Sequence, residues 1–243
     1  MISITRRSRR NRLPKRSQRN RSLKDISAGL RGSFITFEGV EGAGKSTRCR
    51  KLIGSLERSG ISVLHTREPG GPPASERIRS LLLDPELLIS PLTELMLYLA
   101  SRASNVDLVI RPALELGTNV ICERYSDATF AYQIGGRGLP EKPVRDADNL
   151  ATGGLVPDLT ILLDLEPEEG FARLCRQGRE KDRIELEKIS FHRRVRQIYL
   201  ELASMEARYF VIDAALEPDV QDRLIKDRVM SIILRQKSDG GDG

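Results

Sequence analysis

A glycine-rich stretch near residue 40 constrains this chain more than any other part of its sequence. The apolar, β-forming run 34–37 predicts a buried strand, and it leads directly into the spacing Gly-x4-Gly-Lys-Ser over residues 39–46. A helical pattern, 47–57, follows at once. Elements in this order form a phosphate-binding loop, because backbone N–H groups and the positive end of the helix surround an oxyanion.

The side chains of the loop support the same interpretation. Lys45 can reach the terminal phosphates of a nucleotide, and the Ser46 hydroxyl can ligate Mg2+. A glycine-rich turn could share this spacing by chance, but strand, loop and helix arrive in the required order. We therefore expect a nucleoside triphosphate to bind at Gly39, Val40, Glu41, Gly42, Ala43, Gly44, Lys45 and Ser46.

The rest of the chain alternates short apolar runs with longer helical patterns. Strands are predicted at 34–37, 61–66, 119–122, 159–163 and 209–212. Helices are predicted at 47–57, 76–83, 91–116, 126–133, 140–150, 167–176, 189–207 and 218–234, and the glycines at 135, 136 and 138 are expected to end one of them. This alternation predicts an α/β phosphate-loop fold, with a five-stranded parallel sheet covered by helices on both faces.

Several polar residues follow these predicted strands. Arg67, Glu123 with Arg124, and Asp164 each come directly after one, as the phosphate loop does. Ligands of parallel sheets bind beyond the carboxyl ends of the strands. We therefore expect these residues to converge on one crevice.

The charge of the chain is divided unevenly. Residues 1–31 hold 11 of the 40 Lys and Arg residues and one of the 34 acids, so the remainder, with 29 basic and 33 acidic residues, is slightly acidic. We interpret 1–31 as a disordered extension or an over-extended start. A transit peptide and a nucleic-acid patch are the alternatives, the latter weakened by the absence of aromatic residues that stack on bases. The phosphate-loop domain would span 32–236, with 237–243 a flexible tail.

Two features bear on the cellular compartment. No run of about 18 apolar residues is present, so we expect no membrane span, and the start lacks the apolar core of a secretory signal. Cys49, Cys122 and Cys175 are far apart and form no C-x-x-C pair, which supports neither a zinc motif nor a disulfide framework. We expect a protein of the reducing cytoplasm.

A phosphate loop alone does not separate kinases from GTPases, motors and binding proteins. The chain has no guanine-reading Asn-Lys-x-Asp, and Asp164 is followed by Leu165 rather than by the second acid usual in motor ATPases. It has instead a surplus of arginines beyond the loop, namely Arg67, Arg102, Arg124, Arg137, Arg179 and Arg183. Phosphoryl transfer between two polyanions needs such a set, because both must be held in line.

The motifs beyond the loop carry a family resemblance. They lie at 66–71 (Thr-Arg-Glu-Pro-Gly-Gly), 94–102, 110–114, 123–125, 131–133, 136–138, 157–160, 182–185, 191–196 and 199–203. With the loop form Gly-x-Glu-Gly-Ala-Gly-Lys, their order and spacing resemble the bacterial type of thymidylate kinase. That family of P-loop nucleoside monophosphate kinases phosphorylates dTMP to dTDP with ATP. The resemblance runs from about Ser33 to about Leu234.

The resemblance implies roles at the phosphate end of the site. Lys45 and the loop backbone would hold the ATP phosphates, and Ser46 with Glu123 would place Mg2+. Arg67 and Arg124 would hold the phosphate of dTMP. No general base would be needed, since the acceptor is already an anionic phosphate.

It also implies a nucleoside pocket. Tyr98 would stack on thymine and Arg102 would bond the base, although Tyr98 lies in an apolar helical pattern that by itself favours a core position. Glu41 would read the 3′-hydroxyl of the sugar. Tyr132 and Gln133 would line the sugar and base.

A mobile lid is implied as well. The charge-dense segment 177–188 occupies the lid position, and its Arg179 or Arg183 would neutralise charge on the transferring phosphoryl group. An arginine that arrives only on closure also protects ATP from water.

The chain departs from the family pattern at four positions. Glu123 replaces the usual Asp, Tyr98 replaces Phe, Pro72 replaces Thr, and Ala128 stands where Ser is common. These changes bear on rate and selectivity more than on the reaction class.

Two alternatives remain at this stage. One is another nucleotide kinase of the same fold, acting on dUMP or on a deoxynucleoside. The other is a non-catalytic nucleotide sensor or nucleic-acid-binding protein that uses its basic tail, which predicts tight, salt-sensitive DNA binding through 1–31. For the kinase we expect no nucleic-acid partner beyond weak binding by this tail. By resemblance we also expect a homodimer, formed through the 91–116 helix and its neighbours.

Overall fold

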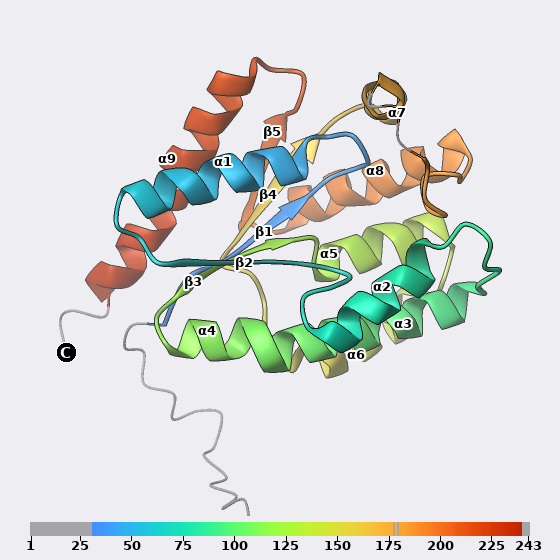
Figure 1. Ribbon diagram of the computed structural model, residues 1–243, viewed down its shortest axis with the longest axis horizontal. Helices are drawn as coiled ribbons and strands as arrows, with labels where there is room; N and C mark the ends of the chain where they lie inside the picture. Colours follow the sequence, from blue (N-terminus) through green and yellow to red (C-terminus); the bar gives the residue numbers. More distant parts are fainter. Residues whose placement is uncertain (1–30, 177, 179, 240–243) are drawn as a thin grey trace, which may run out of the picture.

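Five parallel strands form the centre of the molecule (Figure 1). A computed structural model describes residues 31–176, 178 and 180–239, so the expectations for 1–30 lie outside the described residues. The strands are β1 (Phe34–Glu38), β2 (Val63–Arg67), β3 (Asn119–Glu123), β4 (Leu159–Asp164) and β5 (Tyr209–Asp213), in the order β2-β3-β1-β4-β5. The predicted five-stranded parallel sheet is confirmed.

Helices cover both faces of this sheet. They are α1 (Lys45–Arg58), α2 (Pro73–Leu83), α3 (Pro91–Asn105), α4 (Arg111–Glu115), α5 (Ser126–Thr129), α6 (Glu141–Thr152), α7 (Pro167–Arg176), α8 (Ile189–Met205) and α9 (Pro218–Asp239). Helices α1 and α9 pack on one face, and α4 and α8 pack on the other (Figure 1). Every residue of the central strand β1 is buried, as expected of a strand covered on both sides.

The long helix predicted at 91–116 is interrupted. A π-helical segment, η1 (Val106–Ile110), separates α3 from α4. Pro112 lies in the first turn of α4 and has no N–H, so the regular hydrogen-bond ladder cannot continue through it. Gly117, in the left-handed region with φ of 75°, follows the end of α4 as predicted.

The break predicted at the glycines 135, 136 and 138 lies at the end of this stretch, where Gly138 has a φ of 73°, and not at Gly135 and Gly136 themselves. Helix α5 runs without interruption into a second π-helical segment, η2 (Phe130–Gly136), which includes both glycines. A Cβ on Gly135 would lie 2.5 Å from the Ile198 side chain, and one on Gly136 would lie 2.5 Å from the Phe191 ring. These glycines therefore allow close packing against α8 rather than ending the helix.

The last helix is longer than the sequence suggests. Helix α9 continues through 237–239, part of the segment expected to be loose, because the run Arg235, Gln236 and Lys237 that leads into it favours helix. Residues 240–243 lie outside the described residues. Within the part of the chain that is described, no helix has the length and apolar character needed to cross a membrane.

Candidate active site

A cavity of about 860 Å³ lies beyond the carboxyl ends of β1, β2 and β3. Of the residues predicted to bind a nucleotide or Mg2+, it is lined by Glu41, Gly42, Gly44, Lys45, Ser46, Arg67, Tyr98, Arg102, Glu123, Arg124, Tyr132 and Gln133. The expected convergence is thus confirmed for the phosphate loop, Arg67, Glu123 and Arg124. The prediction that Asp164 also faces this cavity is wrong, because its carboxylate forms a two-point ion pair with Arg196 of α8, at 2.7 and 3.0 Å.

The phosphate loop depends on glycine at specific points. Gly44 has a φ of 92° immediately before α1, a conformation that other residues rarely adopt. A Cβ on Gly42 would lie 2.2 Å from the carbonyl oxygen of Gly170. The first helical turn of α1 contains no acid, so nothing there neutralises its positive end.

Lys45 is held by the loop itself. Its Nζ donates hydrogen bonds to the carbonyl oxygens of Gly39 and Val40, at 2.9 and 2.8 Å. Burial, together with the nearby Arg124 guanidinium, lowers the pKa of Lys45 to about 7. A bound phosphate would favour the charged form, so this amine is positioned for an anion.

Two oxygen ligands suitable for Mg2+ meet beside Lys45. The Ser46 hydroxyl donates a hydrogen bond to Glu123, and His65 Nε2 lies 3.0 Å from the other carboxylate oxygen. Although burial opposes ionisation, the contacts with His65 and Ser46 lower the pKa of Glu123. A hydroxyl and an ionised carboxylate are the hard oxygen donors that Mg2+ prefers.

Arg124 occupies the centre of the cavity wall. Its φ of 66° makes it the one described non-glycine residue in the left-handed region, a strained conformation common at functional sites. Its guanidinium lies 2.7 Å from Glu41 and 3.2 Å from the Gly39 carbonyl oxygen, and 4.9 Å from the centre of the Tyr132 ring. Strand β3 and the turn after it therefore aim a fixed charge into the pocket.

Glu41 connects the phosphate loop to the far wall. Tyr132 donates a hydrogen bond to its Oε1 at 2.6 Å, and His192 Nδ1 lies 3.2 Å from its Oε2. Burial favours the neutral acid, but Arg124 and His192 hold the pKa of Glu41 well below its usual range. His192 is fully buried at this point.

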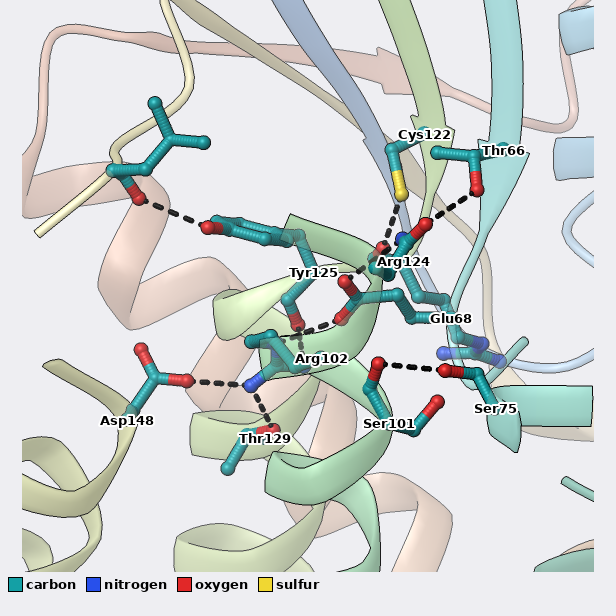
Figure 2. Close-up of polar contacts among 12 residues, drawn as sticks. Thr66, Glu68, Ser75, Ser101, Arg102, Cys122, Arg124, Tyr125, Thr129 and Asp148 are labelled. Atoms are coloured by element: carbon teal, nitrogen blue, oxygen red, sulfur yellow. Dashed lines mark hydrogen bonds and ion pairs between the residues drawn. The ribbon is translucent and has the colours of Figure 1, made fainter. Parts of the chain in front are cut away.

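Arg102 is enclosed rather than exposed to the pocket (Figure 2). It is 1% exposed, and its guanidinium donates to four acceptors at 2.5–2.8 Å: Glu68, Asp148, the Thr129 hydroxyl and the Tyr125 carbonyl oxygen. These bonds use four of its five N–H groups, which leaves one donor on Nη2 for a ligand. Its role in base binding would rest on this single group.

The remaining wall of the nucleoside pocket comes from α3 and η2. Tyr98 is half-buried, and no described residue hydrogen-bonds to its hydroxyl. Gln133 donates its amide to the buried Glu94 at 2.9 Å, so its orientation is fixed. The π-helical geometry of η2 is of the kind that often places side chains at functional sites.

Two arginines lie where β2 passes into α2. Arg67 is half-exposed and pairs with Glu76 at 3.1 Å. Arg79 also lines the cavity and donates a hydrogen bond to the Pro69 carbonyl oxygen at 3.0 Å. Sequence reasoning missed Arg79, although its position one turn after Glu76 on a short helix could have indicated that it faces the same loop.

Of the two arginines expected in the lid, Arg183 is described by the structure, and it does not line the cavity. Arg183 pairs with buried Glu94 at 2.6 Å and donates to the Leu82 carbonyl oxygen at 2.8 Å. Arg179 lies outside the described residues. Arg137 pairs with the same Glu94 at 2.9 Å, so it too supports the wall instead of entering the pocket.

A phosphate loop at the carboxyl end of the central strand of a parallel sheet, with Arg67, Arg79 and Arg124 lining the same cavity, defines a P-loop kinase of small phosphorylated substrates. The model of the thymidylate kinase family matches residues 37–225. The chain belongs to the thymidylate kinase family.

Curated relatives bear the same family name. A thymidylate kinase of Deinococcus radiodurans is 49% identical over 188 residues, which cover 77% of this chain and 91% of that protein. The thymidylate kinase of Trichlorobacter lovleyi is 46% identical over 205 residues, covering 82% and 97%. That of Thermomicrobium roseum is 51% identical over 188 residues, covering 77% and 89%.

Proposed function

We propose that the protein transfers the γ-phosphoryl group of ATP to dTMP, producing dTDP for dTTP synthesis. The observation that carries this proposal is the cavity itself, in which Lys45 and the positive end of α1 lie beside Arg124, and which Arg67 also lines. Such an arrangement holds two phosphate groups in line. Membership of the thymidylate kinase family supports the choice of acceptor.

The phosphoryl transfer requires positioning and charge stabilisation. An oxygen of the dTMP phosphate attacks the γ-phosphorus, and the bond from that phosphorus to the β–γ bridging oxygen breaks as ADP leaves. Lys45 and Arg124 stabilise the charge that spreads over the transferring group. The phosphate acceptor carries its own negative charge, so no side chain has to remove a proton.

Ser46 and Glu123 are the residues that would hold Mg2+. Their oxygen atoms meet beside Lys45, which fits the ligand preference of this ion. Bound Mg2+ would neutralise charge on the β- and γ-phosphates.

The nucleoside would occupy the cavity between α3 and η2. Tyr98 stacks on thymine, and Gln133 and the free donor of Arg102 contact the base. Tyr132 and Glu41 face the sugar. Thymine differs from uracil by one methyl group, and its burial contributes about 1 kcal/mol, so we expect only moderate selectivity over dUMP.

The lid arginines complete this proposal. Arg179 or Arg183 neutralises the transferring group on closure. For Arg183, this requires release from Glu94 and from the Leu82 carbonyl oxygen, contacts that anchor it in the present conformation.

A substrate panel tests the proposed reaction. ADP release with Mg-ATP is measured for dTMP, dUMP, UMP, dCMP and AMP, with the Lys45→Ala variant as the control for contaminating activity. Preference for dTMP supports the proposal. Preference for another monophosphate overturns the assignment of the base pocket. If none of the five is phosphorylated although ATP still binds, the result supports a nucleotide sensor.

We further propose that two copies associate through α3. Leu92 and Met96 lie one turn apart on this helix and are 57% and 51% exposed, and an apolar pair of this kind is suited to an interface. Light scattering after size exclusion should give twice the chain mass, and Met96→Lys should give a monomer.

A cytoplasmic location is also proposed. Cys49, Cys122 and Cys175 are all free thiols. Free thiols are typical of a reducing compartment. Fractionation of cells that make the protein would test this.

A further inference from the structure

Three potential metal ligands gather beside the cavity, two of which, His65 and Glu123, also line it. The Sγ of Cys49, a ring nitrogen of His65 and a carboxylate oxygen of Glu123 all lie within 4.8 Å of one another. Cys49 and His65 are 16 positions apart in the sequence, and His65 and Glu123 are 58 apart, so the three residues form no local metal-binding motif. Sequence reasoning, which considers spacing alone, finds no support for zinc in this chain.

The three side chains come from rigid elements. Cys49 lies on α1, which packs over β2 and β3, and it is completely buried. His65 on β2 and Glu123 at the end of β3 lie on neighbouring parallel strands, in a register that pairs Arg67 with Glu123. Residues two apart on a strand share a face, so His65 and Glu123 meet under α1, 3.0 Å apart. Ligands on such elements need little reorganisation to bind.

We propose that Cys49, His65 and Glu123 form a second metal site that takes Zn2+ and thereby inhibits the binding of Mg-ATP. Tetrahedral zinc has bonds of about 2.3 Å to sulfur and about 2.0 Å to nitrogen or oxygen, so its ligand atoms lie roughly 3.5 Å apart. Because they lie within 4.8 Å of one another, the three atoms need to approach by at most about 1.3 Å. Water supplies the fourth ligand.

The ligand set selects the ion. A thiolate and an imidazole suit Zn2+, Co2+ and other borderline or soft cations, whereas Mg2+ takes oxygen ligands. The Cys49 thiol gives up its proton to solvent as the sulfur–metal bond forms. The cluster is therefore chemically distinct from the Mg2+ position next to it.

Glu123 couples the proposed zinc site to the Mg2+ position beside it. Its carboxylate accepts the Ser46 hydroxyl on one oxygen and contacts His65 on the other. Zinc bound to Cys49 and His65 draws this carboxylate toward β2 and withdraws it from Ser46. Inhibition by zinc thus rests on the proposed role of Glu123 in Mg-ATP binding, but zinc binding itself does not.

Cobalt titration tests the site without any substrate. Co2+ alone is added to the full chain, and we expect thiolate-to-cobalt charge-transfer absorption that saturates at one equivalent and disappears when Zn2+ is added. Cys49→Ala should abolish this absorption. Cys175→Ser, which removes an exposed cysteine outside the cluster, should leave it unchanged. Absence of the band, its survival in Cys49→Ala or its loss in Cys175→Ser would each overturn the proposal.

His65→Val provides a second variant, because His65 is partly exposed on a strand and valine suits that position. It should weaken cobalt binding at least tenfold, and its response to Zn2+ is expressed relative to its own activity in zinc-free buffer. In wild type, Zn2+ should raise the apparent KM for Mg-ATP, and His65→Val should need at least tenfold more Zn2+ for the same effect. Equal zinc sensitivity in both proteins would refute the inhibitory role. Since cobalt binding is measured without substrates, its outcome is separate from the test of the kinase reaction.

Discussion

The two ends of the cavity use charge in opposite ways. At the phosphate end, Lys45 is held by two backbone carbonyl oxygens, so its positive charge is not cancelled by a direct ion pair. At the nucleoside end, Arg102 lies between the carboxylates of Glu68 and Asp148, at 2.7 and 2.5 Å, and is buried with them.

The difference shows how a basic residue can serve two purposes. A cation bonded to neutral carbonyl groups keeps its attraction for a substrate anion. A cation enclosed by carboxylates contributes rigidity and shape, and the pair is costly to break because the partners remain buried. We therefore expect substitutions at the phosphate end to reduce catalysis and those at the nucleoside end to reduce stability.

Arg102→Ala should have the largest effect, on stability. It leaves Glu68 and Asp148 buried without their partner, and breaking a buried ion pair in this way costs about 3–5 kcal/mol. Urea denaturation measures the free energy of unfolding. Lys142→Ala, which removes an exposed pair with Asp146, should change it by less than about 0.5 kcal/mol. A similar small change for Arg102→Ala would contradict the comparison.

Lys45→Ala should mainly reduce catalysis. Loss of a charged donor to the transferring phosphoryl group is expected to lower kcat by about 10²- to 10³-fold, with the fold intact. Steady-state kinetics measures kcat, and thermal unfolding checks that the fold is intact. Lys51→Ala on the same helix, where Lys51 pairs with Asp222 on the surface, is the matched control and should behave as wild type.

Tyr98→Ala should weaken the binding of dTMP without affecting the binding of ATP. Loss of stacking on a base costs about 1–3 kcal/mol, so we expect KM for dTMP to rise roughly tenfold to a hundredfold and KM for ATP to stay constant. Tyr98→Phe should be nearly neutral, since no described residue bonds the hydroxyl. If KM for ATP rose instead, Tyr98 would belong to the other end of the cavity.

The smallest expected effect concerns Glu38, beneath the phosphate loop. Burial and the nearby Asp127 raise its pKa from 4.5 to about 7. The folded protein therefore holds this proton more tightly than the unfolded chain does. The stabilisation is complete below about pH 4.5, and it is lost as the pH rises through 7, with a slope of up to about 1.4 kcal/mol per pH unit.

Glu38→Gln imitates the protonated acid, because its amide can accept from the Tyr125 N–H and donate to the Tyr199 oxygen. Between pH 5 and 7.5, the urea midpoint of unfolding should depend less on pH in this variant than in wild type. Glu57→Gln on the exposed face of α1 should keep the wild-type dependence. If the urea midpoint of Glu38→Gln changed with pH as steeply as that of wild type, Glu38 would be excluded as the source of the pH dependence of stability.

Much of the fold follows from local sequence patterns. The apolar runs and the order of strand, loop and helix predict the five strands and the crevice, because period and turn chemistry are local properties. Gly135 and Gly136 show the limit, since they resemble a helix stop and instead make room for Ile198 and Phe191.

The sequence by itself determined that a phosphate loop opens a parallel sheet and that arginines follow its strands. Only the tertiary structure decided which arginines keep their charge for substrate. Arg124 pairs with Glu41 but remains on the cavity wall, whereas Arg102 is enclosed by Glu68 and Asp148, and Arg183 pairs with Glu94 outside the cavity lining. The meeting of Cys49, His65 and Glu123 is likewise invisible in the sequence. The physical reason is that ion pairing and coordination depend on distances between residues remote in the chain, and packing alone sets those distances.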